Sequence, residues 1–516
     1  MREESHELLD AKISLHDKHR FEVKLDVVLA PGRKNVYRVE TYFFVPRALN
    51  LSPNTYNKND FYASAQEYIR FRTPHMSLGT LGDAANRLSP LHGVHRKLLP
   101  LMAGQHDTKL IDLAVDEMKL LAAIARAAVR DFARHLLGEL EQISKNGPAA
   151  ARLEPVREKG LAFAAEVKSF TEAMNFLSGQ ASNPVLPARL RDAFRCCDEY
   201  LNLTLEDYLT ILLHAVREHP ETAEKLSALD GELVKLILVQ REHGRARGYP
   251  SIMQDSGRNE LMVYRRGVLK KFVSSALHLQ VESSEWEDVT QFLHGLAAGA
   301  VLLFAAAVAL YARNRYATDS MPFVAIVFIA YIFKDRIKDW LKLHFSKGMT
   351  RWLPDRRVGI KDPITGERIG FFKEAFSFVP PGQVPAEINL RRNADNFTTM
   401  DQEGKPERVM KYEKEVTLDP KTVLKFHERR KDLNDIMRFS IDHFLRQADN
   451  PAEDHPHLSD DGKQLEMLRC SRVYHVNMVI RYTSQGSSGN PEISYERVRI
   501  VFNRKGIVRL EEVPVA

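Results

Sequence analysis

The chain has 516 residues, more than the ~250 to 300 at which a single hydrophobic core stops growing, so we expect at least two folded bodies. Its 44% hydrophobic and 28% charged residues exclude a largely disordered chain. The 74 basic residues exceed the 68 acidic ones by only six, which excludes an evenly basic surface, and we expect no nucleic-acid partner. Three cysteines exclude a disulfide framework.

Two segments near the N-terminus have the alternation of half-buried strands. Apolar and charged residues alternate from Phe21 to Leu29, and again from Tyr37 to Val45. Pro31 and Gly32 lie between the two runs and favour a turn. Together these residues predict a β-hairpin.

Helical periodicity dominates the next part of the chain. An apolar 3.6-residue repeat runs from Asp107 until Gly147 and Pro148 end it. Short breaks separate further helical patterns at residues 156–177, 187–218 and 221–243. This spacing predicts an antiparallel helical bundle, followed by another helix over residues 261–279.

The most apolar part of the chain follows the bundle. Residues 293–311 carry no charge, and a helix of that length can cross a hydrocarbon core of ~30 Å. A second apolar run, residues 321–333, is ambiguous alone but can return the chain across the bilayer. We therefore predict a two-helix transmembrane hairpin, roughly residues 289–312 and 317–333, with the lipid bilayer as a partner.

Charge and the N-terminal sequence suggest an orientation for that hairpin. Residues 334–357 contain eight Lys or Arg against three Asp, which places this side in the cytoplasm by the positive-inside rule. The first residues lack the pattern of a cleavable signal peptide. We expect a bacterial-type inner membrane location with both termini cytoplasmic. An apolar stripe from Ile337 to Phe345 indicates either an interfacial helix or a helix packed on a soluble domain.

Gly295 and Gly299 form a Gly-x-x-x-Gly spacing, which permits close helix approach. The spacing has two interpretations. It can mediate homodimerisation, or it can seat the bulky second helix of the hairpin, and we favour the second interpretation because that helix is always present.

The C-terminal part mixes element types. A turn over residues 362–366 precedes a strand pattern over residues 368–379. A helix is expected over residues 421–447. Three more strands are expected near residues 473–482, 493–502 and 507–513, the last two joined by a turn at residues 503–506. Because both ends of the chain are rich in strands, they could share a sheet, which the sequence alone does not establish.

The predicted fold class is an α+β membrane protein with a two-helix transmembrane hairpin, a cytoplasmic helical bundle and strand-rich N- and C-terminal parts. We expect four regions. They are an N-terminal strand-rich region (1–105), a helical bundle (106–286), the transmembrane hairpin (287–335) and a C-terminal α+β domain (336–516).

No residue set predicts a catalytic, metal or cofactor site. His92 and His95 could share a helix face, but zinc needs three or four ligands and none completes the set. Two other histidine-rich segments, residues 16–19 and 454–457, look like polar turns. Cys196 and Cys197 are expected to be buried or half-buried thiols in a helix. No phosphate-binding glycine loop or nucleophile elbow is present.

For two other groups of residues, a functional interpretation is weighed against a structural one. His294 lies at the edge of the first apolar run, but no second ionisable group extends a path through the hairpin. Basic residues with aromatic neighbours over 245–249 and 264–271 are interpreted as a solvated helix face rather than a nucleic-acid contact.

These observations favour a membrane-anchored cytoplasmic scaffold, interaction or regulatory protein that binds a protein partner or itself. The alternatives are a membrane-tethered enzyme whose site is built from residues distant in sequence, and a subunit of a transport complex.

Overall fold

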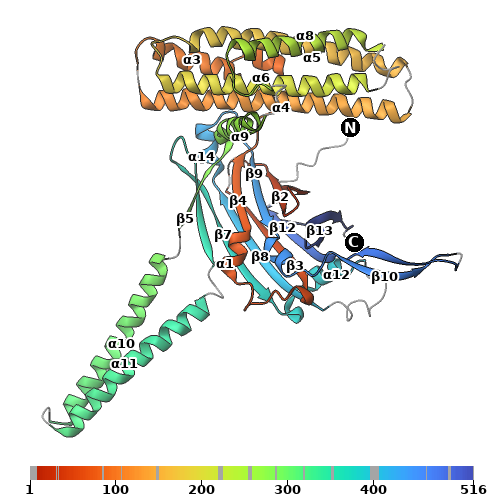
Figure 1. Cartoon of the computed structure of the whole chain (residues 1–516). Helices are drawn as coiled ribbons and strands as arrows, with labels where there is room; N and C mark the ends of the chain where they lie inside the picture. Colours follow the sequence, from red (N-terminus) through yellow and green to blue (C-terminus); the bar gives the residue numbers. More distant parts are fainter. Residues whose placement is uncertain are drawn as a thin grey trace. The chain divides into compact units, whose positions relative to one another are not determined.

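The computed structural model divides the chain into two compact units (Figure 1). Unit 1 contains Met1–Ile69, Leu279–Phe426 and Asp432–Ala516, and unit 2 contains Arg70–His278 and His427–Lys431. The structure describes residues 9–30, 32, 34–83, 86–105, 107–146, 150–218, 225–253, 259–284, 287–317, 320–349, 354–395, 406–460, 462–485 and 490–514.

Unit 1 is built on an eight-stranded antiparallel sheet that joins the two ends of the chain. Its strand order is β14 (Gly506–Glu512), β13 (Pro491–Asn503), β12 (Tyr474–Gln485), β3 (Asn35–Pro46), β8 (Glu407–Leu418), β7 (Arg368–Val379), β6 (Arg356–Lys361) and β5 (Gln280–Ser284). The N-terminal β3 lies between β12 and β8, with Phe44 opposite Asn477 and Phe43 opposite Met410. The strand-rich ends therefore share one sheet.

A second sheet of unit 1 has four strands, in the order β1 (Leu9–Leu15), β2 (Arg20–Val27), β9 (Leu433–Ser440) and β4 (Ala65–Phe71). Phe43 of β3 stacks on Phe439 of β9 with ring centroids 5.5 Å apart, so aromatic side chains join the two sheets. The predicted hairpin between β2 and β3 is wrong. Both strands exist, but each belongs to a different sheet, and the turn at Gly32 carries the chain between sheets.

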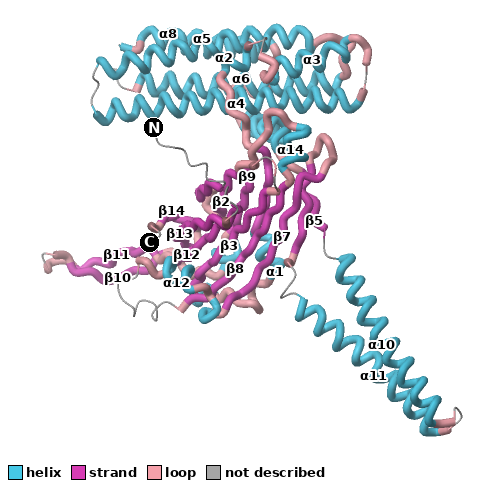
Figure 2. The backbone as a smooth tube through the Cα atoms, turned by 180° about the vertical axis from the view of Figure 1, so that it is seen from behind, coloured by secondary structure: helices cyan, strands magenta, loops and turns pink. Residues whose placement is uncertain are grey.

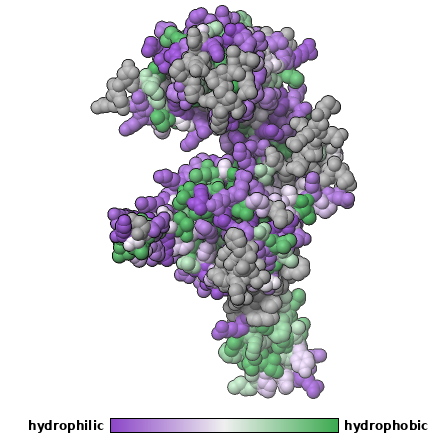
Figure 3. All heavy atoms as spheres, turned by 90° about the vertical axis from the view of Figure 1, so that its right-hand side faces the viewer, coloured by the Kyte–Doolittle hydropathy of each residue, from purple (hydrophilic) through white to green (hydrophobic). Residues whose placement is uncertain are grey.

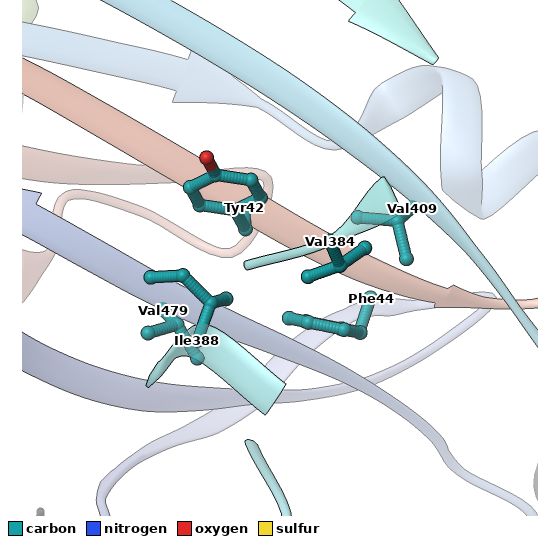
Figure 4. Packing of buried hydrophobic residues seen from close by; sticks show 6 residues of the cluster. All are labelled: Tyr42, Phe44, Val384, Ile388, Val409 and Val479. Carbon is teal, nitrogen blue, oxygen red and sulfur yellow. The ribbon is translucent and has the colours of Figure 1, made fainter. Parts of the chain in front are cut away.

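The opposite face of the large sheet is covered by α12 (Ala386–Arg392) at β3, β8 and β12. Ile388 and Val384 pack there against Tyr42, Phe44, Val409 and Val479 (Figure 4). Alternate residues of β3 therefore bury their side chains in two different cores, because successive side chains of a strand point to opposite faces.

The prediction of one helix over residues 421–447 is wrong for the middle of that range. The structure has two short helices, α14 (Pro420–Phe426) and α15 (Asp442–Arg446), with β9 between them. β9 lies between β2 and β4, where all eight of its residues pair directly with β2 and its first five residues are buried. Tertiary pairing overrides the local helical pattern here.

Two other features complete the strand content of unit 1. The strands predicted near residues 368–379, 473–482, 493–502 and 507–513 are confirmed as β7, β12, β13 and β14. In addition, β10 (Ala452–Leu458) and β11 (Leu465–Ser471) form a separate two-stranded ribbon, visible in Figure 2. Nearly every side chain of this ribbon is exposed.

Unit 2 contains the helical bundle, and the predicted long helices are confirmed. They are α4 (Thr108–Asn146), α5 (Ala150–Ala181), α6 (Ala188–Arg217), α8 (Ser227–Ala246) and α9 (Glu260–Ser274), accompanied by the shorter α2 (Leu78–Gly82) and α3 (Pro90–Met102). Phe132 of α4 stacks on Phe163 of α5 with ring centroids 3.9 Å apart. Between α6 and α8, Asp198 pairs with His243 at 2.9 Å, so the interior of the bundle also contains satisfied polar groups.

The apolar hairpin is a pair of helices, α10 (Glu287–Arg315) and α11 (Met321–Met349), that pack against each other. Among the residues that the structure describes, no helix is both long and apolar enough to cross a membrane. In α11 the apolar run from Met321 to Phe333 is only about 20 Å long at 1.5 Å per residue, and Lys334 follows it in the same helix.

The prediction of a transmembrane hairpin is therefore wrong, because a hairpin needs two helices that span ~30 Å. The fold class is corrected to an α+β fold. The predicted inner-membrane location rested on the two spans of the hairpin and is wrong for the same reason. The stripe from Ile337 to Phe345 lies on α11, but beyond Ile337 its side chains are outside the described residues.

Candidate functional site

Exposed large hydrophobic side chains are concentrated on the hairpin in the described part of the chain. On α10 the residues that face α11 recur at helical spacing and include the buried Val301 and Ala312. Leu303 and Leu310 lie on the other side of α10 and are 73% and 64% exposed. Figure 3 shows apolar side chains gathered over this hairpin.

The second helix has the same two-sided character. Ala330 of α11 is buried, whereas Met321, Phe328 and Ile332 are between 50% and 83% exposed. A helix that is apolar all round is normally covered on every side, so this exposed side is a candidate interaction surface. We call it the outer hairpin face and define it by Gly295, Gly299, Leu302, Leu303, Leu310, Met321, Val324, Phe328 and Ile332.

The glycine pair belongs to the outer hairpin face. Gly295 and Gly299 are both exposed, and a side-chain carbon at either position would meet no described atom within 4 Å. The favoured interpretation, in which these glycines seat the second helix, is therefore wrong. The second interpretation, close approach to another molecule, stays a prediction.

A second candidate is a buried group of charges between the two sheets of unit 1. Lys414 of β8 lies 2.6 Å from Asp435 of β9 and also contacts Glu67 of β4. The Tyr412 hydroxyl donates a hydrogen bond to Glu374 at 2.5 Å and also lies 3.1 Å from a carboxyl oxygen of Glu67. Tyr37 donates to the other oxygen of Asp435 at 2.8 Å. We call these six residues the inter-sheet cluster.

The inter-sheet cluster contains three carboxyl groups and one ammonium group. Burial raises the pKa of Glu67 to about 8, with Asp435 and Glu374 adding to the effect and Lys414 opposing it. Burial also raises the pKa of Glu374. One or more of these carboxyl groups is therefore protonated near neutral pH, which limits the negative charge between the sheets.

The inter-sheet cluster was missed by sequence reasoning, although the alternation contained a signal. Lys414 stands between Tyr412 and Val416 in the inward-facing series of β8, and Asp435 stands between Leu433 and Met437 in β9. A charge at an inward position of a strand is expected to have a buried partner. The partner itself could not be identified, because it comes from another strand.

The histidine and cysteine candidates do not assemble into a reactive centre. His92 and His95 both lie on α3, where His95 pairs with Gln180 at 2.8 Å. Among the described residues no group of three or more His, Cys, Asp or Glu is placed to hold a metal ion. Cys197 is buried, as predicted, and burial raises the pKa of its thiol, whereas Cys470 is exposed on β11.

The remaining sequence candidates lie in different surroundings. Arg265 and Arg266 of α9 form ion pairs with Glu199 and Asp207 of α6, so acidic neighbours occupy these basic groups. His455 and His457 lie on the exposed ribbon. The side chain of His294 is outside the described residues.

Comparison with known proteins adds no assignment. Neither a protein-family model nor a curated protein matches the chain.

Proposed function

We propose that this protein is an interaction protein that self-associates, with the outer hairpin face of one copy packing against the same face of a second copy. The observation that carries the proposal is the two-sided apolar character of α10 and α11. Each helix already buries one apolar stripe against the other, yet retains a second stripe in the open. Removing apolar surface of this kind from water lowers the free energy, which favours a contact that covers it.

The size of the surface supports a stable contact. The seven large hydrophobic side chains of the outer hairpin face are 50–83% exposed. At ~200 Å² for a fully exposed large side chain, they present about 900 Å². Monomeric proteins rarely expose apolar patches above a few hundred Å², and a standard interface buries ~800 Å² on each partner. The outer hairpin face is therefore large enough for a dimer contact.

The shape of the two helices favours an identical partner. The outer side of α10 contains the small residues Gly295 and Gly299, whereas the outer side of α11 contains bulky residues such as Phe328. In a contact between two copies, the small stripe of one copy can receive the bulky stripe of the other. The α10 stripe of one copy is thus complementary to the α11 stripe of another.

The test compares the purified full-length protein with the double variant Leu303→Gln, Phe328→Gln by sedimentation velocity at micromolar concentrations. We expect the wild-type chain to sediment as a dimer and the variant to shift toward a monomer, because each glutamine places a polar group in the contact. Both side chains are exposed within one copy, so the folding of the monomer should change little.

The matched control is Leu261→Gln, Phe176→Gln. These side chains are 75% and 67% exposed and lie in unit 2, outside the hairpin. This variant should remain dimeric. A monomeric wild-type chain would contradict the proposal, as would an equal effect of both variants. Flotation of the wild-type chain with lipid vesicles, without self-association, would assign the surface to lipid instead.

A further inference from the structure

A groove of about 740 Å³ opens at one end of the four-stranded sheet of unit 1. It lies where the turn between β1 and β2 meets the start of β4 and the end of β9. This volume lies within the ~300 to 1,000 Å³ of small-molecule sites. Ala63 is the one aliphatic side chain among the described lining residues, and the others have polar or charged groups.

The carboxylates of this groove already have partners. Asp17 accepts hydrogen bonds from the backbone of His19 at 2.8 Å and from Arg20 at 2.9 Å. Asp442 lies 2.7 Å from His19 Nδ1 and accepts a hydrogen bond from Ser440 at 2.7 Å. Asp60 accepts a hydrogen bond from the backbone of Asn57. These carboxylates are therefore not arranged to bind a cation.

The arrangement of Ser440, Asp442 and His19 does not form a catalytic triad. Asp442 lies between the serine and the histidine, so the imidazole does not contact the hydroxyl that it would have to deprotonate. Binding, rather than nucleophilic catalysis, is what this geometry supports.

Two cationic side chains of the groove are available for a ligand. Lys18 and Arg446 both line it, and among the described residues no acidic side chain is recorded within ion-pair distance of either, although Arg446 is near enough to Asp442 to contribute to the lowered pKa of that carboxyl group. His443 lies beside them and contacts the Tyr56 ring edge-on at 4.9 Å. An ammonium and a guanidinium group that no close ion pair holds are suited to a phosphate group.

We propose that this groove binds a small phosphorylated metabolite with a polar body, whose phosphate group contacts Lys18 and Arg446. The neighbouring Asp17 and Asp442 have carboxylate oxygens that can accept further hydrogen bonds from hydroxyl groups of the same ligand. A sugar phosphate and a nucleotide share this chemistry, and both fit the volume of the groove. The proposal is independent of the hairpin contact.

The experiment is isothermal titration calorimetry on the full-length protein with glucose 6-phosphate, AMP and inorganic phosphate, and with glucose as the probe that lacks phosphate. We expect binding of at least one organic phosphate and none of glucose. Stronger binding of glucose 6-phosphate than AMP would identify a sugar phosphate as the ligand class, and the reverse order a nucleotide.

Variants then locate the site. Lys18→Gln and Arg446→Gln should each weaken binding about tenfold, because each removes a charge-assisted hydrogen bond. Lys361→Gln removes a basic group from β6, outside the groove, and should bind normally. Far-ultraviolet circular dichroism checks that each variant is folded, and Arg446→Lys should retain part of the affinity.

Three outcomes would overturn the proposal. They are no binding of any phosphate probe at millimolar concentration, equal binding of glucose and glucose 6-phosphate, and unchanged affinity in folded Lys18 and Arg446 variants.

Discussion

Replacing Lys414 by methionine should lower the free energy of unfolding of unit 1 by about 3–5 kcal/mol, the usual effect of removing one partner from a buried ion pair. The side chain of Lys414 is 4% exposed, and its ammonium group is the cation that Glu67 and Asp435 share. Methionine fills a similar volume but leaves Asp435 without its counter-charge and Glu67 without its hydrogen-bond partner. Thermal unfolding followed by circular dichroism should show a midpoint roughly 10 °C lower.

Lys373→Met is the matched control for this prediction. Lys373 lies on the neighbouring strand β7, but its side chain is 36% exposed and lies 3.6 Å from Glu415. Exposed pairs of this kind contribute about 0–1 kcal/mol, so the control should change the midpoint little. The triple variant Lys414→Met, Glu67→Gln, Asp435→Asn should recover part of the loss. Equal effects of the Lys373 and Lys414 substitutions would show that the inter-sheet cluster is not a buried charge group.

The second large effect concerns pH. Burial raises the pKa of Glu67 to about 8 in the folded protein, above the ordinary value of 4.5. Between these values the folded state holds a proton that the unfolded state has lost. The stabilisation is therefore complete below about pH 4.5 and disappears as the pH rises through about 8. Unit 1 of the wild-type chain should become less stable across this interval.

Glu67→Gln should remove much of this pH dependence, because the amide is neutral throughout. The measurement is the unfolding midpoint of both proteins at several values from about pH 5 to about pH 8.5. The curve of the variant should be flatter, with a residual slope from Glu374, whose pKa is also raised. Glu415→Gln is the control. The hydrogen bond from Arg38 lowers the pKa of Glu415, so this substitution should change the stability only at acidic pH. Parallel curves for wild type and Glu67→Gln would refute the assignment.

Local patterns in the sequence were sufficient for elements but not for their partners. The alternation around β2 and β3 identified both strands, yet β3 pairs with strands that begin at Glu407 and Tyr474. Such pairing depends on long-range packing that no local window contains. β9 was missed for the same reason, because its neighbours in the sheet, β2 and β4, come from the N-terminal part of the chain.

The candidate sites follow the same rule. The apolar character of α10 and α11 was evident from composition, but only the structure separates the inner side from the outer hairpin face. The inter-sheet cluster needs β4, β7, β8 and β9 together, and the groove needs the turn before Arg20 beside α15. Charged residues on separate strands have no sequence spacing that could reveal such sites.

Cross-linking between copies tests the central claim, self-association through the outer hairpin face, most directly. Gly299→Cys is introduced into a chain in which Cys196 and Cys470, the two cysteines that are not buried, are replaced by serine. The site is exposed and a side chain there meets no described atom within 4 Å, so the substitution should be tolerated. Mild oxidation should then produce a disulfide-linked dimer at high yield. Met253→Cys, 65% exposed in unit 2, is the control and should remain a monomer on a non-reducing gel. Equal cross-linking at both positions, or none at Gly299, would contradict the account.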